Sequence, residues 1–396
     1  MRRTFIITLI FIILIGIAAF VYFYFFANKA GVVAPNGSTN LPVAGQGTPI
    51  TGDTSGSGAA LTVTARLVKI SAGPIVPGEV VVNIPAENAS SSPEPEVAVN
   101  YIERQSGNVY AYRTHSGTLT RTNNKTVPGI LSAQWLPDAS FAFVRYLSGS
   151  DFSTINSYAL PSSDSGGFFL SQNIADIAVS STSILVLASG VNGSVASTEH
   201  TDGTHTLEVF TTPLSSLRIS FAGKSRYLAY TKPSATLDGS AFLVDDTGHF
   251  SSIAGPHNGL VALSSPSGKW VLVSYTLDTV MQMELINTTT GDTVPLPVAT
   301  IADKCVWTAD DSSLYCGIPV SPASGYAYPD DWYQGVVHFS DRIWKIDVAD
   351  RYAQLVLDFP KETKDSLDAQ ALAIDPLDTV LVFMNKNDGS LWSYSL

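Results

Sequence analysis

The chain has 396 residues, of which 45% are hydrophobic and only 14% are charged, so it can bury a large core and is too apolar to be disordered. Its 22 basic residues are outnumbered by 34 acidic ones, a net charge of −12, and this negative field argues against nucleic-acid binding, which needs basic surface. The two cysteines exclude a disulfide-dense miniprotein and a paired Cys-x-x-Cys metal or redox site.

The first element is an apolar run from Phe5 to Phe26, in which only Thr8 and Gly16 fall outside the hydrophobic residues. Its 22 residues match the roughly 20 that a helix needs to cross a bilayer, whereas the apolar region of a cleaved signal peptide, the alternative, is typically about 7–15 residues long. Because Arg2 and Arg3 precede the run, the positive-inside rule predicts a cytoplasmic N-terminus with the rest of the chain outside. The sequence therefore predicts a single-pass protein of the cytoplasmic membrane that contacts the lipid bilayer through this run.

These features divide the chain into three predicted parts. The cytoplasmic tip and transmembrane anchor occupy residues 1–28, a flexible linker occupies 29–60, and a folded domain occupies 61–396. The linker contains no aromatic residue and is rich in small and polar residues, so it cannot bury enough surface to fold. A coil of this length has a root-mean-square reach on the order of 30 Å, which holds the domain near the membrane.

From Leu61 onward, short runs of Val, Ile, Tyr, Phe and Thr alternate with Gly, Pro, Asp and Ser, a pattern that indicates strands and turns. A unit of strand, tight polar turn and strand recurs, and its equivalent positions are Trp135, Val179, Phe221, Ser264, Trp307 and Ile374. The steps between them are 44, 42, 43, 43 and 67 residues. All but the last match the roughly 40–45 residues of a four-stranded propeller blade, so the predicted class is all-β and the predicted fold a β-propeller.

The two ends of the domain complement each other. The last unit has three strands, and Arg66 to Ile70 is a strand without a unit of its own. We predict that this strand completes the last blade, which closes the ring and covers its edge strands. The count gives seven blades; six are the alternative, because the first unit is irregular across Pro85 to Glu96. A two-sheet sandwich would not explain so even a spacing.

The turns of these units resemble those of a known family. Leu-Pro-Asp follows Trp135 and Ser-Ser-Pro-Ser-Gly follows Leu263, each between two apolar strands. The pattern resembles the WD40-like repeats of the TolB family of bacterial envelope propellers over residues 65–396, and the layout resembles uncharacterised bacterial proteins with one N-terminal anchor and an outer propeller. The chain departs from the TolB pattern in its turns at Ala309 and Asp375 and in lacking a preceding α/β domain. The resemblance therefore implies the fold and carries over no functional residue.

Motifs for catalysis are missing from the sequence. It contains neither His-Glu-x-x-His nor a Gly-x-Ser-x-Gly elbow. His200 and His205 flank a predicted Asp202-Gly203 hairpin turn, but two ligands are too few for a stable zinc site. On this basis the sequence predicts no enzymatic activity, no cofactor and no metal site.

The long last step contains an insertion, Ile318 to His338, that gives this unit 24 residues more than its neighbours. Long loops in compact domains are commonly functional, and aromatic faces beside carboxylates suit stacking on sugars or enclosing a cation. The candidate binding residues are Tyr326, Tyr328, Asp330, Asp331, Trp332 and Tyr333. In the alternative interpretation these aromatic side chains fold inward and cap the neck of the ring.

The two cysteines, Cys305 and Cys316, lie on strands joined through the Asp310-Asp311 turn. A register that pairs Trp307 with Leu314 also places the two cysteines opposite each other. Opposed strand positions have Cα atoms about 4.5–5.5 Å apart, within the range of a disulfide, so this pair is a disulfide candidate.

The sequence is most informative about architecture and least informative about function. It favours a membrane-anchored, extracytoplasmic binding or scaffold propeller whose partner is an envelope protein or a cell-wall glycan. The alternative is a hydrolase or lyase that acts on envelope polysaccharide, since propellers can place carboxylates around a central channel.

Overall fold

The computed structural model describes residues 66–84, 96–150, 152, 154–164, 166–171 and 174–396. The apolar run Phe5–Phe26 and the linker 29–60 lie outside these residues. Within the described ranges, no helix is both long enough and apolar enough to cross a membrane. Strands and turns make up nearly all of the described chain, so the predicted all-β class is confirmed.

The described strands pair into six antiparallel sheets, five with four strands and one with seven. The first sheet contains β2 (Val80–Ile84), β3 (Glu96–Ile102), β4 (Val109–Arg113) and β5 (Leu119–Asn123). The second contains β6 (Ile130–Trp135), β7 (Phe141–Ser148), β8 (Thr154–Pro161) and β9 (Phe168–Phe169). The third contains β10 (Ile174–Val179), β11 (Ser183–Gly190), β12 (Gly193–His200) and β13 (Leu207–Thr212).

The seven-stranded sheet contains β14 (Leu217–Phe221), β15 (Tyr227–Thr231), β16 (Asp238–Val244), β17 (Phe250–Ser264), β18 (Trp270–Leu277), β19 (Val280–Asn287) and β20 (Thr293–Pro295). Its strand β17 has 15 residues and serves two neighbours. Phe250–Ala254 pairs with β16, and Val261–Ser264 pairs with β18. This sheet therefore holds two of the predicted repeat units, those at Phe221 and Ser264.

The remaining two sheets contain the C-terminal strands and the short helices. One has β21 (Cys305–Trp307), β22 (Ser313–Pro319), β23 (Asp341–Asp347) and β24 (Ala353–Leu357), with the 3-10 helix η1 (Ala302–Lys304) before it. The helices α2 (Asp330–Tyr333) and α3 (Phe359–Glu362) lie in its connections. The other has β25 (Ala369–Ile374), β26 (Val380–Asn385), β27 (Leu391–Ser395) and the N-terminal strand β1 (Leu67–Lys69).

The predicted closure by the N-terminal strand is confirmed. Strand β1 pairs antiparallel with β27, Leu67 lying opposite Tyr394. The Arg66 guanidinium adds a hydrogen bond from its Nη2 to the carbonyl oxygen of Ser395 at 2.9 Å and lies over the Tyr394 ring. This pairing covers the backbone edge that β27 would otherwise expose.

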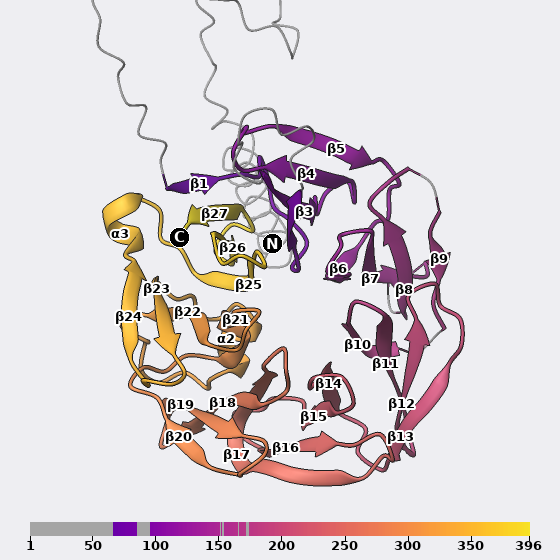
Figure 1. The fold of residues 1–396 in the computed structure, drawn as a ribbon, viewed down its shortest axis with the longest axis vertical. Coiled ribbons are helices and arrows are strands. Elements are labelled where there is room, and N and C mark those ends of the chain that lie inside the picture. The colour runs from indigo at the N-terminus through magenta and orange to yellow at the C-terminus, as the bar shows by residue number, and fades with distance from the viewer. Residues whose placement is uncertain (1–65, 85–95, 151, 153, 165, 172–173) are drawn as a thin grey trace, which may run out of the picture. The chain divides into compact units, whose positions relative to one another are not determined.

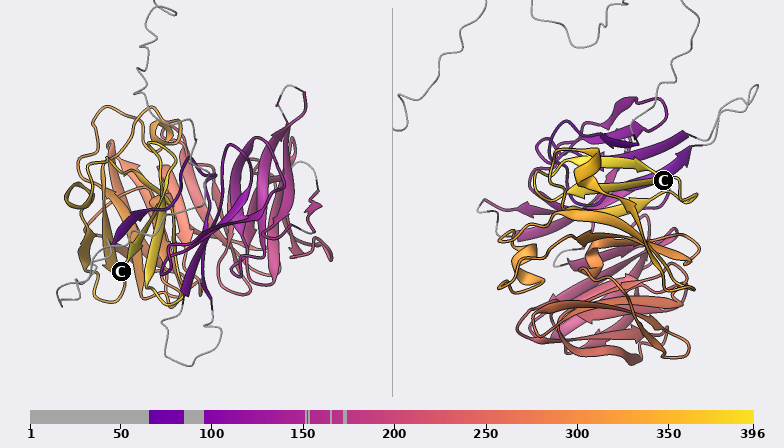
Figure 2. Two further views of the ribbon diagram at one scale, coloured as in Figure 1. Left: turned by 90° about the horizontal axis from the view of Figure 1, so that it is seen from above. Right: turned by 90° about the vertical axis from the view of Figure 1, so that its left-hand side faces the viewer.

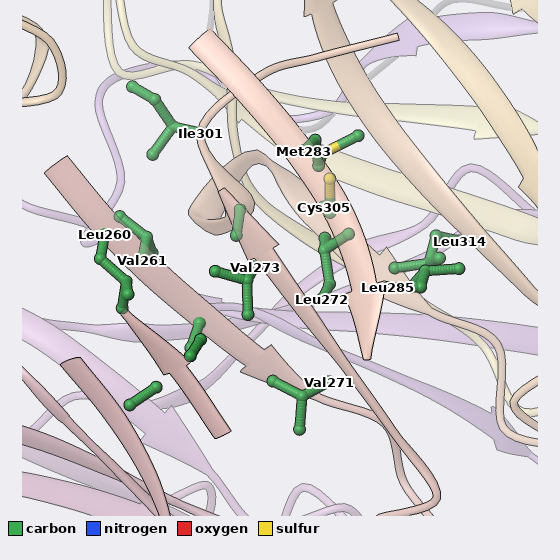
Figure 3. Close-up of a cluster of buried hydrophobic side chains, with 14 of the residues drawn as sticks. Leu260, Val261, Val271, Leu272, Val273, Met283, Leu285, Ile301, Cys305 and Leu314 are labelled. Carbon is green, nitrogen blue, oxygen red and sulfur yellow. The ribbon is translucent and has the colours of Figure 1, made fainter. Parts of the chain in front are cut away.

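Apolar clusters between successive sheets hold the domain together. One cluster joins β1 and β26 to the first sheet, and another joins the seven-stranded sheet to β21 and β22. Figure 3 shows part of the latter, with Leu272 and Leu285 gathered near Leu314. Because each sheet packs on both faces, inner strands such as β26 are buried along their whole length. At roughly 25 cal/mol per Å², this burial is the main stabilising term.

The sheets follow one another around a centre, with β6, β10, β14, β21 and β25 towards it and β1 at the outer edge of the last sheet (Figure 1). Neighbouring innermost strands contact each other, including β25 with β2, β6 with β10, and β10 with β14. Seen from the side, most strands run along the axis of this ring (Figure 2). The residues at the start of the innermost strands are thus brought together although they are about 40 residues apart in sequence.

Candidate functional site

The predicted binding insertion folds onto the ring. Trp332, expected to be the main stacking group, is only 1% exposed. Its Nε1–H donates to Asp368 Oδ2 at 3.0 Å, and its ring stacks on Phe339 with centroids 6.2 Å apart. A ring enclosed on both faces cannot stack on a ligand, so the role predicted for Trp332 is corrected to a structural one.

The other tyrosines of the insertion have different surroundings. Tyr328 is buried and its hydroxyl donates to the carbonyl oxygen of Ala323 at 2.8 Å, while the Tyr333 hydroxyl donates to Asp303 Oδ2 at 2.7 Å. Tyr326 is the exposed one, at 36%. These side chains thus do not share one ligand surface, and their packing follows the alternative in which the insertion is a cap.

The two carboxylates of the insertion hold backbone. Asp330 Oδ2 accepts from the backbone N–H of Ala235 at 3.1 Å, and Asp331 Oδ2 accepts from that of Ala327 at 2.7 Å. The first bond fixes the insertion to the connection after β15, and the second shapes the turn that leads into α2. Both carboxylates therefore have structural partners.

A glycine allows the cap to approach the ring closely. Gly259 in β17 has φ +67°, and a Cβ there would lie 2.9 Å from the carbonyl oxygen of Tyr328 and from Pro329 Cδ. The same carbonyl accepts from Thr276 Oγ1 at 3.1 Å. A larger residue at Gly259 would push the insertion away and also strain the backbone.

The structure contains a disulfide between Cys305 and Cys316. Strands β21 and β22 pair in the register that the turn predicts, with the two cysteines opposite each other and Trp307 opposite Leu314. The disulfide lies directly after η1, so it fixes the start of an innermost strand.

A charged cluster lies where several innermost strands begin, and sequence reasoning missed it. We call it the mouth cluster; its members are Arg145 of β7, Asp176 of β10, Arg218 of β14, Tyr230 of β15, Asp303 of η1 and Tyr333 of α2. All except buried Tyr230 are partly exposed, and the Arg218 and Asp303 side chains are 37% and 27% exposed. They are therefore accessible to a ligand.

Hydrogen bonds connect most of the mouth cluster. Arg218 Nη1 donates to Asp303 Oδ2 at 2.6 Å and to the Tyr230 hydroxyl at 3.3 Å. Asp176 accepts from the backbone N–H of Ile219 at 3.0 Å, which joins β10 to β14. Arg145 is near enough to interact with both Asp176 and Arg218, and its buried Nε has no hydrogen-bond partner in the described structure. The Nε is closed to solvent, so an anionic ligand would be bound by the remaining N–H donors of this partly exposed side chain.

The electrostatics of the mouth cluster suit proton transfer beside fixed positive charge. Burial raises the pKa of the Asp176 carboxyl, an effect opposed by the Ile219 N–H and by both arginines. Burial lowers the pKa of Arg145, whereas Asp303 raises the pKa of Arg218. Asp176 is thus a carboxylate of increased basicity next to two guanidinium groups.

A sequence pattern could have indicated this cluster. Asp176 interrupts the apolar run of β10, and Arg218 interrupts that of β14, both near the start of an innermost strand. Charged residues at such positions are rarely buried without a partner or a role. Only the ring geometry reveals that Asp303 and Arg145 complete the group.

His200 ends β12, and His205 lies in the connection after it. Their rings stack with centroids 4.5 Å apart. Neither residue belongs to the mouth cluster. In the residues that the structure describes, no group of three or more His, Cys, Asp or Glu side chains is placed to hold a metal ion. The histidine pair therefore has no third ligand of these types there.

A second concave region lies between the first and second sheets. It is a groove of roughly 250 Å³ whose polar lining residues are Asn100, Arg113, Thr120, Thr122, Asp138 and Ser162. Its lining includes one arginine and one carboxylate. It lacks the concentration of charge that distinguishes the mouth cluster.

Comparisons with known proteins support the fold. Neither the family models nor the curated proteins gave a match. Among solved structures, the chain is similar to an oligogalacturonate lyase from Vibrio parahaemolyticus, with 9% identity, a TM-score of 0.55 and coverage of 85% of this chain and 94% of that one. An oligogalacturonate lyase in complex with manganese gives 9% identity and a TM-score of 0.53, covering 76% of this chain and 86% of that one.

A third similar structure is the Kuenenia stuttgartiensis hydrazine synthase, with 11% identity, a TM-score of 0.53 and coverage of 82% of this chain and 97% of that one. Identities this low show the fold alone. The similarity nevertheless contradicts the prediction of a non-enzymatic protein. That prediction treated a propeller without a familiar catalytic motif as non-catalytic, whereas two of these similar structures are lyases. The described chain is an all-β propeller fold of a kind that enzymes also use.

Proposed function

We propose that this protein is a lyase acting on an acidic polysaccharide of the cell envelope, with the mouth cluster as its active site. The observation that carries the proposal is the placement of Arg145 and Arg218 near Asp176, on the sheets before and after the one that holds Asp176. A uronic acid unit brings a carboxylate that a guanidinium binds through two parallel hydrogen bonds. The chain as a whole has a net charge of −12, so two neighbouring arginines form a locally basic site on an acidic protein.

The residues present can perform a β-elimination. Binding of the uronate carboxylate to Arg145 and Arg218 withdraws charge from the sugar and acidifies the hydrogen on the carbon next to that carboxylate. Asp176 accepts this proton, the glycosidic C–O bond on the adjacent ring carbon breaks, and a carbon–carbon double bond forms. The Tyr333 hydroxyl, which is partly exposed and bonded to Asp303, can supply a proton to the departing oxygen and be reprotonated afterwards from solvent.

Two further considerations support a lyase over a glycan-binding scaffold. Similar folds are used by oligogalacturonate lyases, whose named substrate is an acidic oligosaccharide. In the insertion predicted to bind a glycan, Trp332 and Tyr328 are buried instead. One of those lyases contains manganese, but the described residues of this chain include no cluster fit to hold a metal ion, and no step is assigned to one.

The test is an activity assay on the detergent-solubilised full chain with oligogalacturonate and other uronate-containing oligosaccharides. We expect products that absorb in the ultraviolet through the new double bond. Arg145→Gln should lower kcat/KM by about 10²–10³-fold, the effect of removing one donor that stabilises developing charge. The matched control is Arg121→Gln on exposed β5, which should keep full activity.

Two results would contradict this proposal. New reducing ends without ultraviolet absorbance would indicate a hydrolase. Equal activity of the Arg145→Gln protein and the wild type would place the active site elsewhere. Because both variants remove one arginine charge, a general effect of charge on substrate attraction is separated from a specific one.

We further infer the architecture in which this site works. Seven blades are supported by the even sequence spacing and by the two roles of β17, which ends one repeat unit and begins the next. The anchor 1–28, the linker 29–60 and an external domain 61–396 remain predictions from the Phe5–Phe26 run and the arginines before it. Protease added to cells with a permeable outer layer should release the domain by cutting in the linker, and protection of the linker would reverse the topology.

A further inference from the structure

A second charged cluster is fully buried beneath the cap. The side chains of Lys304, Asp341 and Asp368 are all 0% exposed, and they come from η1, from the start of β23 and from the residue before β25. Lys304 Nζ donates to Asp341 Oδ2 at 2.8 Å, to Asp368 Oδ1, and to the carbonyl oxygen of Ala369 at 2.8 Å. A lysine nitrogen is thus held in contact with a carboxyl group that it could attack.

The walls of this cluster are aromatic. Lys304 Nζ lies 4.9 Å from the centre of the Trp332 ring and 5.2 Å from that of Phe339. Lys386 Nζ lies 4.9 Å from the Trp332 ring and is the other cation near the cluster. Burial takes the lysine and both carboxyl groups out of water, so they depend on one another and on the neighbouring backbone groups for hydrogen bonds.

We propose that Lys304 and Asp368 condense into an intramolecular amide, with Asp341 transferring the protons. The reaction needs a nucleophilic amine, an activated carboxyl group and a proton shuttle, and each has a residue in position. It needs no oxidant, reductant or co-reactant. It is independent of the function proposed for the mouth cluster.

The contacts of Asp368 suit an acyl group under attack. Its Oδ2 accepts from Trp332 Nε1 at 3.0 Å and from the backbone N–H of Phe339 at 2.9 Å, so two donors stabilise the negative charge that develops on this oxygen. Its Oδ1, which contacts Lys304 Nζ and also accepts from Trp332 Nε1 at 3.2 Å, is the oxygen that leaves. The backbone N–H of Asp368 donates to Asn385 Oδ1 at 3.0 Å and fixes the residue.

Asp341 is arranged to move protons in this reaction. Its Oδ2 is 2.8 Å from Lys304 Nζ and also accepts from the backbone N–H of Ala369 at 2.7 Å, whereas its buried Oδ1 has no hydrogen-bond partner. Burial raises the pKa of Asp341 to about 6, a raise opposed by Lys304 and reinforced by Asp368. Such a group can both accept and return a proton near neutral pH.

The steps balance without an outside reagent. A proton moves from the Lys304 ammonium to Asp368, and the neutral Nζ attacks Cγ of Asp368 to form the N–C bond. Asp341 accepts the second proton from nitrogen and delivers it to Oδ1, the C–Oδ1 bond breaks, and one water molecule leaves. The amide keeps Oδ2 as its carbonyl oxygen, and Asp341 returns to its starting state.

The amide would cross-link two neighbouring sheets beside the ring closure. Lys304 precedes β21 and Asp368 precedes β25, 64 residues later, and β25 belongs to the sheet that β1 completes. The Cys305–Cys316 disulfide begins at the next residue after Lys304. The disulfide ties strands within one sheet, whereas the amide ties that sheet to the next.

The test is peptide mapping by mass spectrometry of the full chain after reduction, alkylation and trypsin digestion. We expect the peptides containing Lys304 and Asp368 to appear joined, lighter by one water molecule than their sum, with no cleavage after Lys304. Asp341→Asn should abolish the joined species, and Asp331→Asn in the same insertion should retain it. Separate, unmodified peptides from the wild-type protein would overturn the proposal.

The joined peptide is sought first in the wild-type protein, so this measurement is unaffected if a variant fails to fold. Circular dichroism of the Asp341→Asn protein establishes whether it is folded. A folded Asp341→Asn protein that still forms the joined species would overturn the role assigned to Asp341.

Discussion

Replacement of Trp332 by alanine tests whether the insertion is a structural cap. Trp→Ala changes at buried positions cost about 3–5 kcal/mol, through lost burial and the cavity that remains. Trp332 is 1% exposed and also donates to the buried Asp368, which keeps the Phe339 N–H and Lys304 as partners, so the lost hydrogen bond costs about 1 kcal/mol more. Since the two terms share one side chain and are not additive, we expect the free energy of unfolding to fall by about 3–5 kcal/mol.

Urea unfolding followed by fluorescence and circular dichroism measures this loss. Trp332→Phe should recover most of the packing but not the hydrogen bond. Its free energy of unfolding should therefore lie between those of the wild type and Trp332→Ala. Tyr326→Ala, at the exposed tyrosine of the same insertion, should change stability by less than about 0.5 kcal/mol. A Trp332→Ala protein of nearly unchanged stability that no longer binds envelope glycan would refute the cap and restore the binding interpretation.

Three further predictions concern stability. Deletion of Arg66 to Ile70 should lower the melting temperature and promote aggregation, because it exposes the edge of β27; an unchanged melting curve would contradict closure. Replacing Cys305 and Cys316 by serine should cost about 3 kcal/mol, because the bond closes a loop with a sequence separation of 11 residues. Wild-type protein unfolded in denaturant without reductant should take up no alkylating reagent. Hydrogen bonds from the Ser312 N–H, which contributes most, and from side-chain hydroxyl groups lower the pKa of Asp310 to about 2. The stabilisation that Asp310 provides is therefore present above about pH 4 and fades towards pH 2. The difference in melting temperature between the wild type and Asp310→Ala should shrink over that interval.

The sequence was informative about features that depend on neighbours in the chain. Repeat spacing and the opposition of Cys305 and Cys316 follow from strand alternation and turn length. These are local rules of register, and they hold wherever a sheet is buried on both faces. The pairing of β1 with β27 joins the two ends of the chain and was predicted instead from the count of strands in the last unit.

The site depends on contacts that the sequence does not encode locally. Asp176, Arg218 and Asp303 are 42 and 85 residues apart, and only the curvature of the ring brings them into one cluster. The aromatic insertion was misinterpreted for a related reason. Its composition suits ligand binding and core packing equally well. Trp332 is buried because its Nε1–H donates to the buried carboxyl group of Asp368, a contact that the composition does not reveal.

The same dependence on the ring explains how one end of the domain serves two purposes. The adjacent residues Asp303 and Lys304 of η1 belong to different clusters: Asp303 bonds with Arg218 at the partly exposed mouth, and Lys304 lies beneath the cap. Tyr333 and Trp332 of α2 divide in the same way. The cap therefore positions one side of the candidate active site while it seals the buried cluster.

The most direct test of the proposed function is a crystal structure of the protein soaked with an acidic trisaccharide composed of uronic acid units. We expect a sugar carboxylate paired with the guanidinium groups of Arg145 and Arg218. The hydrogen on the ring carbon next to that carboxylate should point at Asp176. A trisaccharide bound only in the groove between the first and second sheets, or density absent from the mouth cluster at saturating ligand, would contradict the proposed function.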